Sequence, residues 1–356
     1  MLTDRSRNCN YPVAIQPGPG LLGSRSSLVG QHSNGGQFQW SAAIVSARET
    51  IATLAASIDA VIRASSGTRT QIDVIVNGNH RLAKEAAEHA HSLAGMNPPI
   101  DLRIWAITTG DKANALNQYI HEIYSGSEIA FFVDGYAQVA PDAFRLMAAG
   151  LAERPDALAI SGIPTVGRTA RTQAQRMIRG GGGHGTLNAL RGSVCLQLRE
   201  INFRLPLGLY RVDGLLFAVL AFNLDPACNS WDLSRLLVDP SVTWSFRPLT
   251  LWRLSDLQSY AKRLLRQAQG LLENQAFRQH LAIERKPVAA LPRSAAELIN
   301  SWLAASPARA LSTLLRQPLS LFAARRLRQP QDWADADLSP EMIASVSLGD
   351  DRRPEV

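Results

Sequence analysis

Hydrophobic and polar positions alternate in a regular rhythm along the first half of the chain. Short apolar runs begin near Ala43, Ile72, Ile100 and Ile129, and successive runs start 28 or 29 residues apart. Runs of this length that are rich in β-branched residues predict buried strands. The segments between them have helical patterns. Strands that alternate with helices predict βαβ units and a mostly parallel sheet with helices on its faces.

Three helices are predicted between these strands. Over residues 51–62, apolar residues follow the i, i+3, i+4 spacing of an amphipathic helix. Residues 81–93 are strong helix formers that stop before Gly95, and residues 112–124 form the third pattern, which ends near Gly126. An α/β fold class follows.

The rest of the chain does not share this rhythm. Residues 1–40 are rich in Gly, Ser, Pro and Asn, which predicts an irregular N-terminal extension. Residues 165–192 contain seven glycines and five arginines, and we expect a mobile loop there that leads into more ordered structure. From about residue 256 the pattern is helical and basic, and the last dozen residues are polar and predicted to fray.

Composition narrows the class of protein and its compartment. The chain is 46% hydrophobic and 19% charged, which is typical of a soluble globular protein. Its net charge of +7 either favours anionic partners or serves solubility. Three scattered cysteines and a start without an apolar signal core predict a cytoplasmic protein. The longest apolar run, residues 215–222, is too short to span a bilayer.

Several familiar sites are excluded by their missing motifs. The turn after the first strand, VSARETIA, lacks the glycines of a dinucleotide fingerprint. The chain has no phosphate-binding P-loop motif, no G-x-S-x-G elbow and no H-E-x-x-H zinc motif. Aromatic and basic residues do not interleave on the predicted strands, so we expect no nucleic-acid partner.

Polar residues stand where the predicted strands end. Glu49 closes the first strand, Asn77 the second and Asp134 the fourth, while Lys112 opens the helix after the third. Ligands of parallel sheets bind at the carboxyl ends of the strands. A carboxylate that ends a buried run needs a partner there, because an unpaired buried charge is costly. We therefore expect these side chains to converge on one site.

Four segments, in order and spacing, resemble the nucleotide-binding half of family 2 glycosyltransferases of the GT-A fold. The resemblance covers residues 41–165 well and extends more loosely to about residue 270, with its strongest motif at residues 110–117. The segments are AIVSARE, VIVNGN, GDKANALN and FFVDGYAQVAPDA. It implies a GT-A-type, Rossmann-like, mostly parallel sheet with a C-terminal helical extension, and a glycosyltransferase activity.

The resemblance also implies a division of the chain. Residues 41–255 would form the glycosyltransferase domain, with a nucleotide-binding half over 41–165 and an acceptor half over 166–255. Residues 256–356 would form a helical, basic C-terminal region. Residues 185–216 look like the acceptor region of the family, and residues 262–270 are weakly similar to its later arginine-containing helix.

The resemblance implies a nucleotide-diphosphate sugar as the donor. Glu49 and Asn77 would bind the base or ribose, and Lys112 would meet a phosphate. Asp134 would hold a divalent cation, Mg²⁺ or Mn²⁺, that bridges the diphosphate. From the residues alone other roles stay open. Asp134 also suits a strand-end turn, Glu49 a helix N-terminus, and Lys112 a solvated helix surface.

The chain departs from the family at the metal motif. The D-x-D pattern of the family would place a second carboxylate two residues after Asp134, where this chain has Tyr136. Either Asp134 holds the ion with water molecules, or the metal is required only weakly and Tyr136 or Gln138 touches the sugar. Arg48 also stands where the family often has Asn.

For the transfer step the resemblance implies a general base at Asp213, and Val212 replaces the first acid of the motif of the family. The alternative is that Asp213 caps the apolar segment that follows it. His184 would contact the donor phosphate or the acceptor, and Arg191 would pair with a phosphate, or else both would be surface residues. Two tryptophans would stack on an acceptor sugar or pack in the core, Trp244 and Trp252.

The resemblance thus implies an inverting hexosyl- or N-acetylhexosaminyltransferase of polysaccharide biosynthesis, with a saccharide or lipid-linked saccharide as acceptor. Basic C-terminal helices with Arg316, Arg325, Arg326 and Arg328 would lie on an anionic membrane surface or pack on the main domain. The main alternative is a catalytically silent module that binds nucleotide sugars and has a degenerate metal motif. A sugar-phosphate nucleotidyltransferase is disfavoured because no glycine-rich, arginine-containing loop follows the first strand.

Overall fold

A computed structural model describes residues 38–95, 99–167, 169–246, 254–329 and 331–349, without the side chains of residues 254–263. Of the predicted N-terminal extension, residues 1–37 lie outside the described residues, and so does Trp252.

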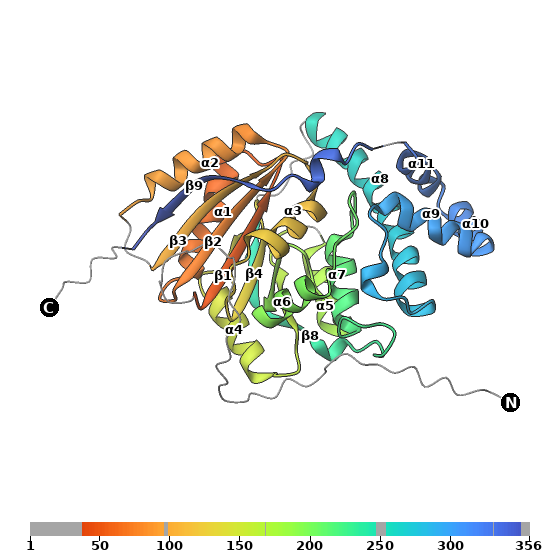
Figure 1. Ribbon diagram of the computed structural model, residues 1–356, viewed down its shortest axis with the longest axis horizontal. Coiled ribbons are helices and arrows are strands. Elements are labelled where there is room, and N and C mark those ends of the chain that lie inside the picture. The colour runs from red at the N-terminus through yellow and green to blue at the C-terminus, as the bar shows by residue number, and fades with distance from the viewer. Residues whose placement is uncertain (1–37, 96–98, 168, 247–253, 330, 350–356) are drawn as a thin grey trace, which may run out of the picture. The chain divides into compact units, whose positions relative to one another are not determined.

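A nine-stranded sheet organises the described residues, in the order β5-β8-β6-β7-β4-β1-β2-β3-β9 (Figure 1). Neighbours among β3, β2, β1 and β4 are parallel, as are β6 and β8, and the other pairs are antiparallel. The strands are β1 Trp40–Ser46, β2 Thr70–Asn77, β3 Ile100–Ile107, β4 Ile129–Asp134, β5 Gln138–Val139, β6 Ala159–Pro164, β7 Leu187–Arg191, β8 Leu236–Ser245 and β9 Glu341–Ser347.

The predicted α/β fold class is confirmed, with four parallel strands at the centre of a mixed sheet, and these are the four predicted strands. Side chains of Thr50, Asn79 and Asp111 cap the helices α1, α2 and α3, each accepting a hydrogen bond from a backbone N–H of the first turn. The α-helices are α1 Ile51–Ala64, α2 His80–Ser92, α3 Lys112–Gln118, α4 Ala143–Glu153, α5 Ala170–Gly180, α6 Gly192–Glu200, α7 Val212–Ala221, α8 Leu254–Phe277, α9 Ala295–Ala305, α10 Pro307–Arg316 and α11 Pro318–Leu327.

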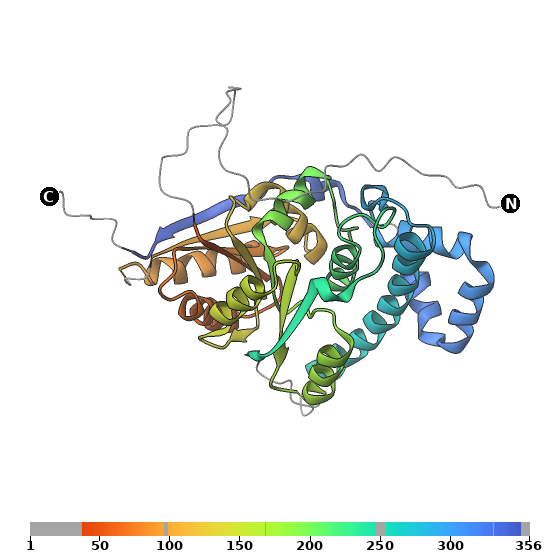
Figure 2. The ribbon, with the colours of Figure 1, turned by 90° about the horizontal axis from the view of Figure 1, so that it is seen from below.

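Two hydrophobic cores lie on the two faces of the sheet, because side chains alternate along each strand. In β1, Ala42 and Ile44 belong to the core that includes α1, α2 and α4, whereas Ala43 and Val45 belong to the core that includes α3, α6 and α7. Figure 2 shows α1 and α2 together on one side of the sheet. With both faces covered, polar groups of the central strands meet a ligand only at the strand ends.

The prediction of a loop over residues 165–192 is wrong in part. Residues 170–180 form α5, and residues 187–191 form β7. The glycines are concentrated after residue 179, whereas residues 170–179 are mostly good helix formers such as Ala, Gln, Arg and Met. Ala174 and Met177 are buried and anchor the helix. Only the short link from Gly181 to Thr186 connects the two elements.

The C-terminal region contains α8 to α11, as the helical pattern predicts, but it also returns to the sheet. Strand β9 pairs antiparallel with β3, and the dark blue arrow in Figure 1 runs beside it. Ala344 and Val346 are buried there, so the prediction that the last dozen residues fray is wrong for residues 345–347, and residues 350–356 lie outside the described residues. Within the described ranges, no helix has the length and apolar character needed to cross a bilayer.

The turn after β2 depends on a close approach of two glycines. Gly78 has φ +67°, and a Cβ atom there would lie 2.5 Å from the Cα of Gly110. Gly67 has a similar φ of +79° but open space around it. We expect Gly67→Ala to cost about 1 kcal/mol of unfolding free energy through the left-handed backbone alone. Gly78→Ala should cost about 1–3 kcal/mol more through the clash, measured by urea denaturation. Equal losses for the two variants would contradict this packing.

Candidate active site

The ends of β1 and β2 are tied together by polar contacts. The side chain of Asn77 is buried, and its Nδ2 donates to the carbonyl of Ser46 at 2.9 Å. The Oε2 atom of Glu49 accepts from the Ser46 hydroxyl at 2.7 Å and from the backbone N–H groups of Ala47 and Arg48 at 2.8 and 2.9 Å. These bonds hold the turn that follows β1.

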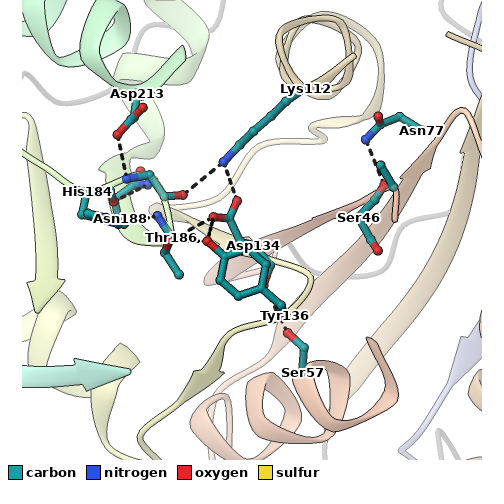
Figure 3. Close-up of polar contacts among 12 residues, drawn as sticks. Ser46, Ser57, Asn77, Lys112, Asp134, Tyr136, His184, Thr186, Asn188 and Asp213 are labelled. Carbon is teal, nitrogen blue, oxygen red and sulfur yellow. Dashed lines mark hydrogen bonds and ion pairs between the residues drawn. The ribbon is translucent and has the colours of Figure 1, made fainter. Parts of the chain in front are cut away.

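Asp134 has side-chain partners at both of its carboxylate oxygens (Figure 3). Its Oδ1 atom accepts an ion-paired hydrogen bond from Lys112. Its Oδ2 atom accepts from the hydroxyls of Tyr136 and Thr186, at 2.9 and 3.0 Å. The two hydroxyl oxygens are 3.0 Å apart. The carboxylate at the end of the buried strand is therefore fully engaged within the protein.

Lys112 reaches the site from the first turn of α3. Its Nζ atom also lies 3.5 Å from the carbonyl oxygen of Gly185. Burial acts to lower the pKa of Lys112, but the charges of Asp134 and Asp213 outweigh it and raise that pKa above its ordinary value. The ammonium group therefore stays charged at neutral pH, where it is able to meet an anion.

Asp213 faces this pair from the first turn of α7. Its Oδ2 atom accepts from the backbone N–H of Gly185 at 3.1 Å. A Cβ atom at Gly185 would lie 2.9 Å from the Cβ of Asp213, so a glycine is needed for this approach. The residue that precedes α7 is Arg211, so the alternative that Asp213 is the N-cap is wrong.

A buried carboxylate positions the start of α7. Glu273 of α8 is fully buried, and its two oxygens accept from the backbone N–H groups of Tyr210 and Arg211 at 2.9 and 2.7 Å. Gln269 donates to the same carboxylate at 2.8 Å. Burial raises the pKa of Glu273. Sequence reasoning missed this residue, although an acid directly after Leu271 and Leu272 in a helical pattern was a usable signal.

Lys112, Asp134 and Asp213 line one pocket at the carboxyl edge of the sheet. The volume of the pocket that is open to water is about 20 Å³, which is enough for about one water molecule. Glu49 and Asn77 do not line this pocket, but they lie on the neighbouring strand ends. The other lining residues are Val45, Leu116, Phe132, Val133, Gly185, Asn188, Val212, Leu216 and Phe217.

His184 and Asn188, which follow the glycine run, also belong to the site. The Nδ1 atom of His184 accepts from the backbone N–H of Thr186 at 3.2 Å, and its ring lies 5.2 Å from that of Trp244. Burial lowers the pKa of His184. Asn188 lines the pocket, and its buried Oδ1 has no partner among the described residues. Trp244 is itself buried and packs in the core.

Arg191 requires a correction, because it is far from the expected donor site. It pairs with Ile129, at the start of β4 and thus at the opposite edge of the sheet from Asp134. Its guanidinium donates to the backbone carbonyls of Leu151, Arg154 and Ala157. Arg191 therefore secures the end of α4. Arg191 is the last residue of β7, and because this strand runs antiparallel to β4, its end lies at the opposite edge from the site.

Three arginines from distant parts of the chain lie close enough to repel one another, and sequence reasoning did not bring them together. Burial lowers the pKa of Arg266 on α8, and the positive charges of Arg48 and Arg326 lower it further. Arg48 follows β1, and Arg326 belongs to α11. Such mutual repulsion marks a place where a bound anion would be favoured.

The described side chains do not fit a protein-held divalent cation well. They contain no group of three or more His, Cys, Asp or Glu residues that could hold a metal ion. Both oxygens of Asp134 are already engaged, and Tyr136 occupies the second position of the D-x-D pattern. A cation at Asp134 would have to displace the charged end of Lys112.

The fold is α/β, with a mixed central sheet of the GT-A type that glycosyltransferases share. A mannosyltransferase from Pyrobaculum calidifontis, solved with GDP-Man and Mn²⁺, matches with a TM-score of 0.51 and 16% identity over 84% of this chain and 86% of that chain. TarS from S. aureus, solved with UDP-GlcNAc, matches with a TM-score of 0.45 and 12% identity over 81% and 80%. No family model and no curated protein matches the sequence.

The lowered pKa of His184 predicts a pH-dependent stability. When the pH falls below 6.5, the ordinary pKa of histidine, His184 of the unfolded chain binds a proton, whereas buried His184 of the folded protein stays neutral. The free energy of unfolding should therefore fall as the pH decreases through this range. His184→Gln should reduce the loss of Tm between about pH 7.5 and about pH 5. His91→Gln, at an exposed position of α2, should follow the wild type. A wild-type slope in His184→Gln would contradict the assignment.

Proposed function

We propose that this protein transfers a sugar from a nucleotide-diphosphate sugar to the hydroxyl of a saccharide or lipid-linked saccharide. The observation that carries the proposal is the shared pocket of Lys112, Asp134 and Asp213 at the carboxyl edge of a GT-A-type sheet. The ammonium group of Lys112 faces the carboxylates of Asp134 and Asp213 there. A transfer of this kind needs a positive charge for the anionic leaving group and a base for the hydroxyl nucleophile.

The donor is proposed to lie across the ends of β1, β2 and β4. Glu49 and Asn77 stand where a base or ribose would approach, and Lys112 is the cation for the diphosphate. Arg48 and Arg266 add positive charge, and the planar guanidinium group suits phosphate oxygens. Beyond these contacts, the buried Oδ1 of Asn188 and the ring of His184 are available to sugar hydroxyls.

Asp213 is the proposed general base. Its carboxylate takes the proton of the acceptor hydroxyl while that oxygen attacks the anomeric carbon. The bond between the anomeric carbon and the phosphate oxygen breaks, and its electron pair leaves with the nucleoside diphosphate. One displacement inverts the anomeric configuration. The transferred group is a hexosyl or N-acetylhexosaminyl unit, and polysaccharide biosynthesis is the proposed setting.

The experiment that tests this function is a transfer and hydrolysis assay over a panel of nucleotide sugars, with GDP-mannose included because the similar mannosyltransferase was solved with it. Nucleoside diphosphates are screened in parallel by thermal shift. A nucleotide that raises Tm while no donor is hydrolysed or transferred would favour the alternative of a silent binding module.

Asp213→Asn separates chemistry from binding. It should lower turnover by at least about 100-fold, because a general base contributes about 10²–10⁴ in rate. The Tm shift caused by the nucleoside diphosphate should remain, since Asp213 does not contact it in this proposal. Asp156→Asn is the matched control at an exposed position near the opposite edge. Full turnover in Asp213→Asn would exclude this residue as the base.

The proposed cation requirement is weak, because Lys112 and the arginines supply charge that a metal would otherwise supply. Tyr136→Asp restores the second carboxylate and removes one hydroxyl partner of Asp134. We expect EDTA to leave the nucleotide-induced Tm shift of the wild type nearly unchanged. In Tyr136→Asp the shift should instead depend on added Mn²⁺. A wild-type shift that EDTA abolishes would contradict weak dependence.

A further inference from the structure

Two consecutive C-terminal helices expose large apolar side chains. On α10, Leu311 and Leu315 are 59% and 69% exposed, and on α11 Phe322 is 64% exposed. Leu319 and Leu321 of α11 are exposed as well. Leu311 and Leu315 are four residues apart and therefore share one face of α10. We call these five exposed side chains the apolar face of α10 and α11.

The residues that anchor the two helices are small. Ala310 is the buried residue of α10, and Ser320, Ala323 and Ala324 are those of α11. An amphipathic helix of a globular protein normally turns its large apolar residues inward. Here the large residues face outward and the small ones inward, so the apolar face of α10 and α11 is not explained by packing on the protein. An exposed cluster of this kind marks an interaction site.

Positive charge surrounds the same face. The chain has no acidic residue between Glu297 and Asp332, whereas the two helices and the residue after them carry five exposed arginines. None of the five forms an ion pair within the described part of the chain, and Arg326 contributes to the repulsion felt by Arg266. The arginines are Arg309, Arg316, Arg325, Arg326 and Arg328.

We propose that the apolar face of α10 and α11 binds the surface of an anionic lipid bilayer. Leucine and phenylalanine would enter the boundary between headgroups and acyl chains, while the arginines meet lipid phosphates. An uninterrupted run of positive charge beside exposed apolar residues is complementary to such a surface. The binding does not depend on the proposed glycosyl transfer, because it needs neither donor nor acceptor.

The test is co-sedimentation of the full chain with vesicles of phosphatidylcholine mixed with phosphatidylglycerol, and with vesicles of phosphatidylcholine alone. The wild type should pellet with the mixed vesicles and be released by high salt. Leu315→Glu/Phe322→Glu should weaken binding by at least about tenfold, because it removes apolar insertion and adds repulsion. Arg325→Gln should weaken it by about fivefold. Leu196→Glu is the control, because Leu196 is 48% exposed on α6.

Each outcome decides the proposal. Circular dichroism and Tm establish that the variants are folded, and Arg325→Gln tests the charge without changing an apolar residue. Loss of binding in the double variant with retention in Leu196→Glu supports the proposal. A wild type that stays in the supernatant with both vesicle types overturns it. Sedimentation velocity that shows a wild-type dimer, dissociated by Leu315→Glu/Phe322→Glu, would also overturn it, because the face would then pair with a second copy.

Discussion

The ion pair between Lys112 and Asp134 determines how the site is arranged. Lys112 begins the helix that follows β3, and Asp134 ends β4, with β1 and β2 between those strands in the sheet. Their side chains are 35% and 13% exposed, so screening by water limits what the pair adds to stability. Its main effect is local. It keeps a charged ammonium group beside a carboxylate whose other oxygen is held by two hydroxyls, and an incoming diphosphate would compete for that ammonium group.

Two further carboxylates fix the opposite wall. Asp111 caps α3 through one oxygen, and its other oxygen accepts from the backbone N–H of Gly208 at 3.1 Å. Glu273 holds the next N–H groups along the same segment, just before α7. Burial raises the pKa of both acids. The segment that leads to Asp213 is thus restrained from α3 and from α8, so the distance between Asp213 and Lys112 depends on elements more than 150 residues apart.

Much of this arrangement could be predicted from the sequence, because strand periodicity and the ends of apolar runs are local signals. Asp134, Lys112 and Asp213 are brought together as expected, while the chemical roles of these residues stay predictions. The positions that depend on strand direction or distant pairing could not be found. Arg191 ends an antiparallel strand and lies at the other edge, Glu273 acts through backbone groups of another segment, and β9 shows no pattern that would assign it to β3.

The return of the chain to the sheet through β9 has a consequence for the C-terminal helices. The helices α8 to α11 lie between β8 and β9, two strands of one sheet, so they are an insertion held at both ends. A pulling force applied to α10 or α11 would therefore act on both β8 and β9, and the helices would not detach as a free C-terminal segment would. Truncation before residue 341 would also leave β3 as an exposed edge strand, and exposed edge strands pair with other chains and promote aggregation.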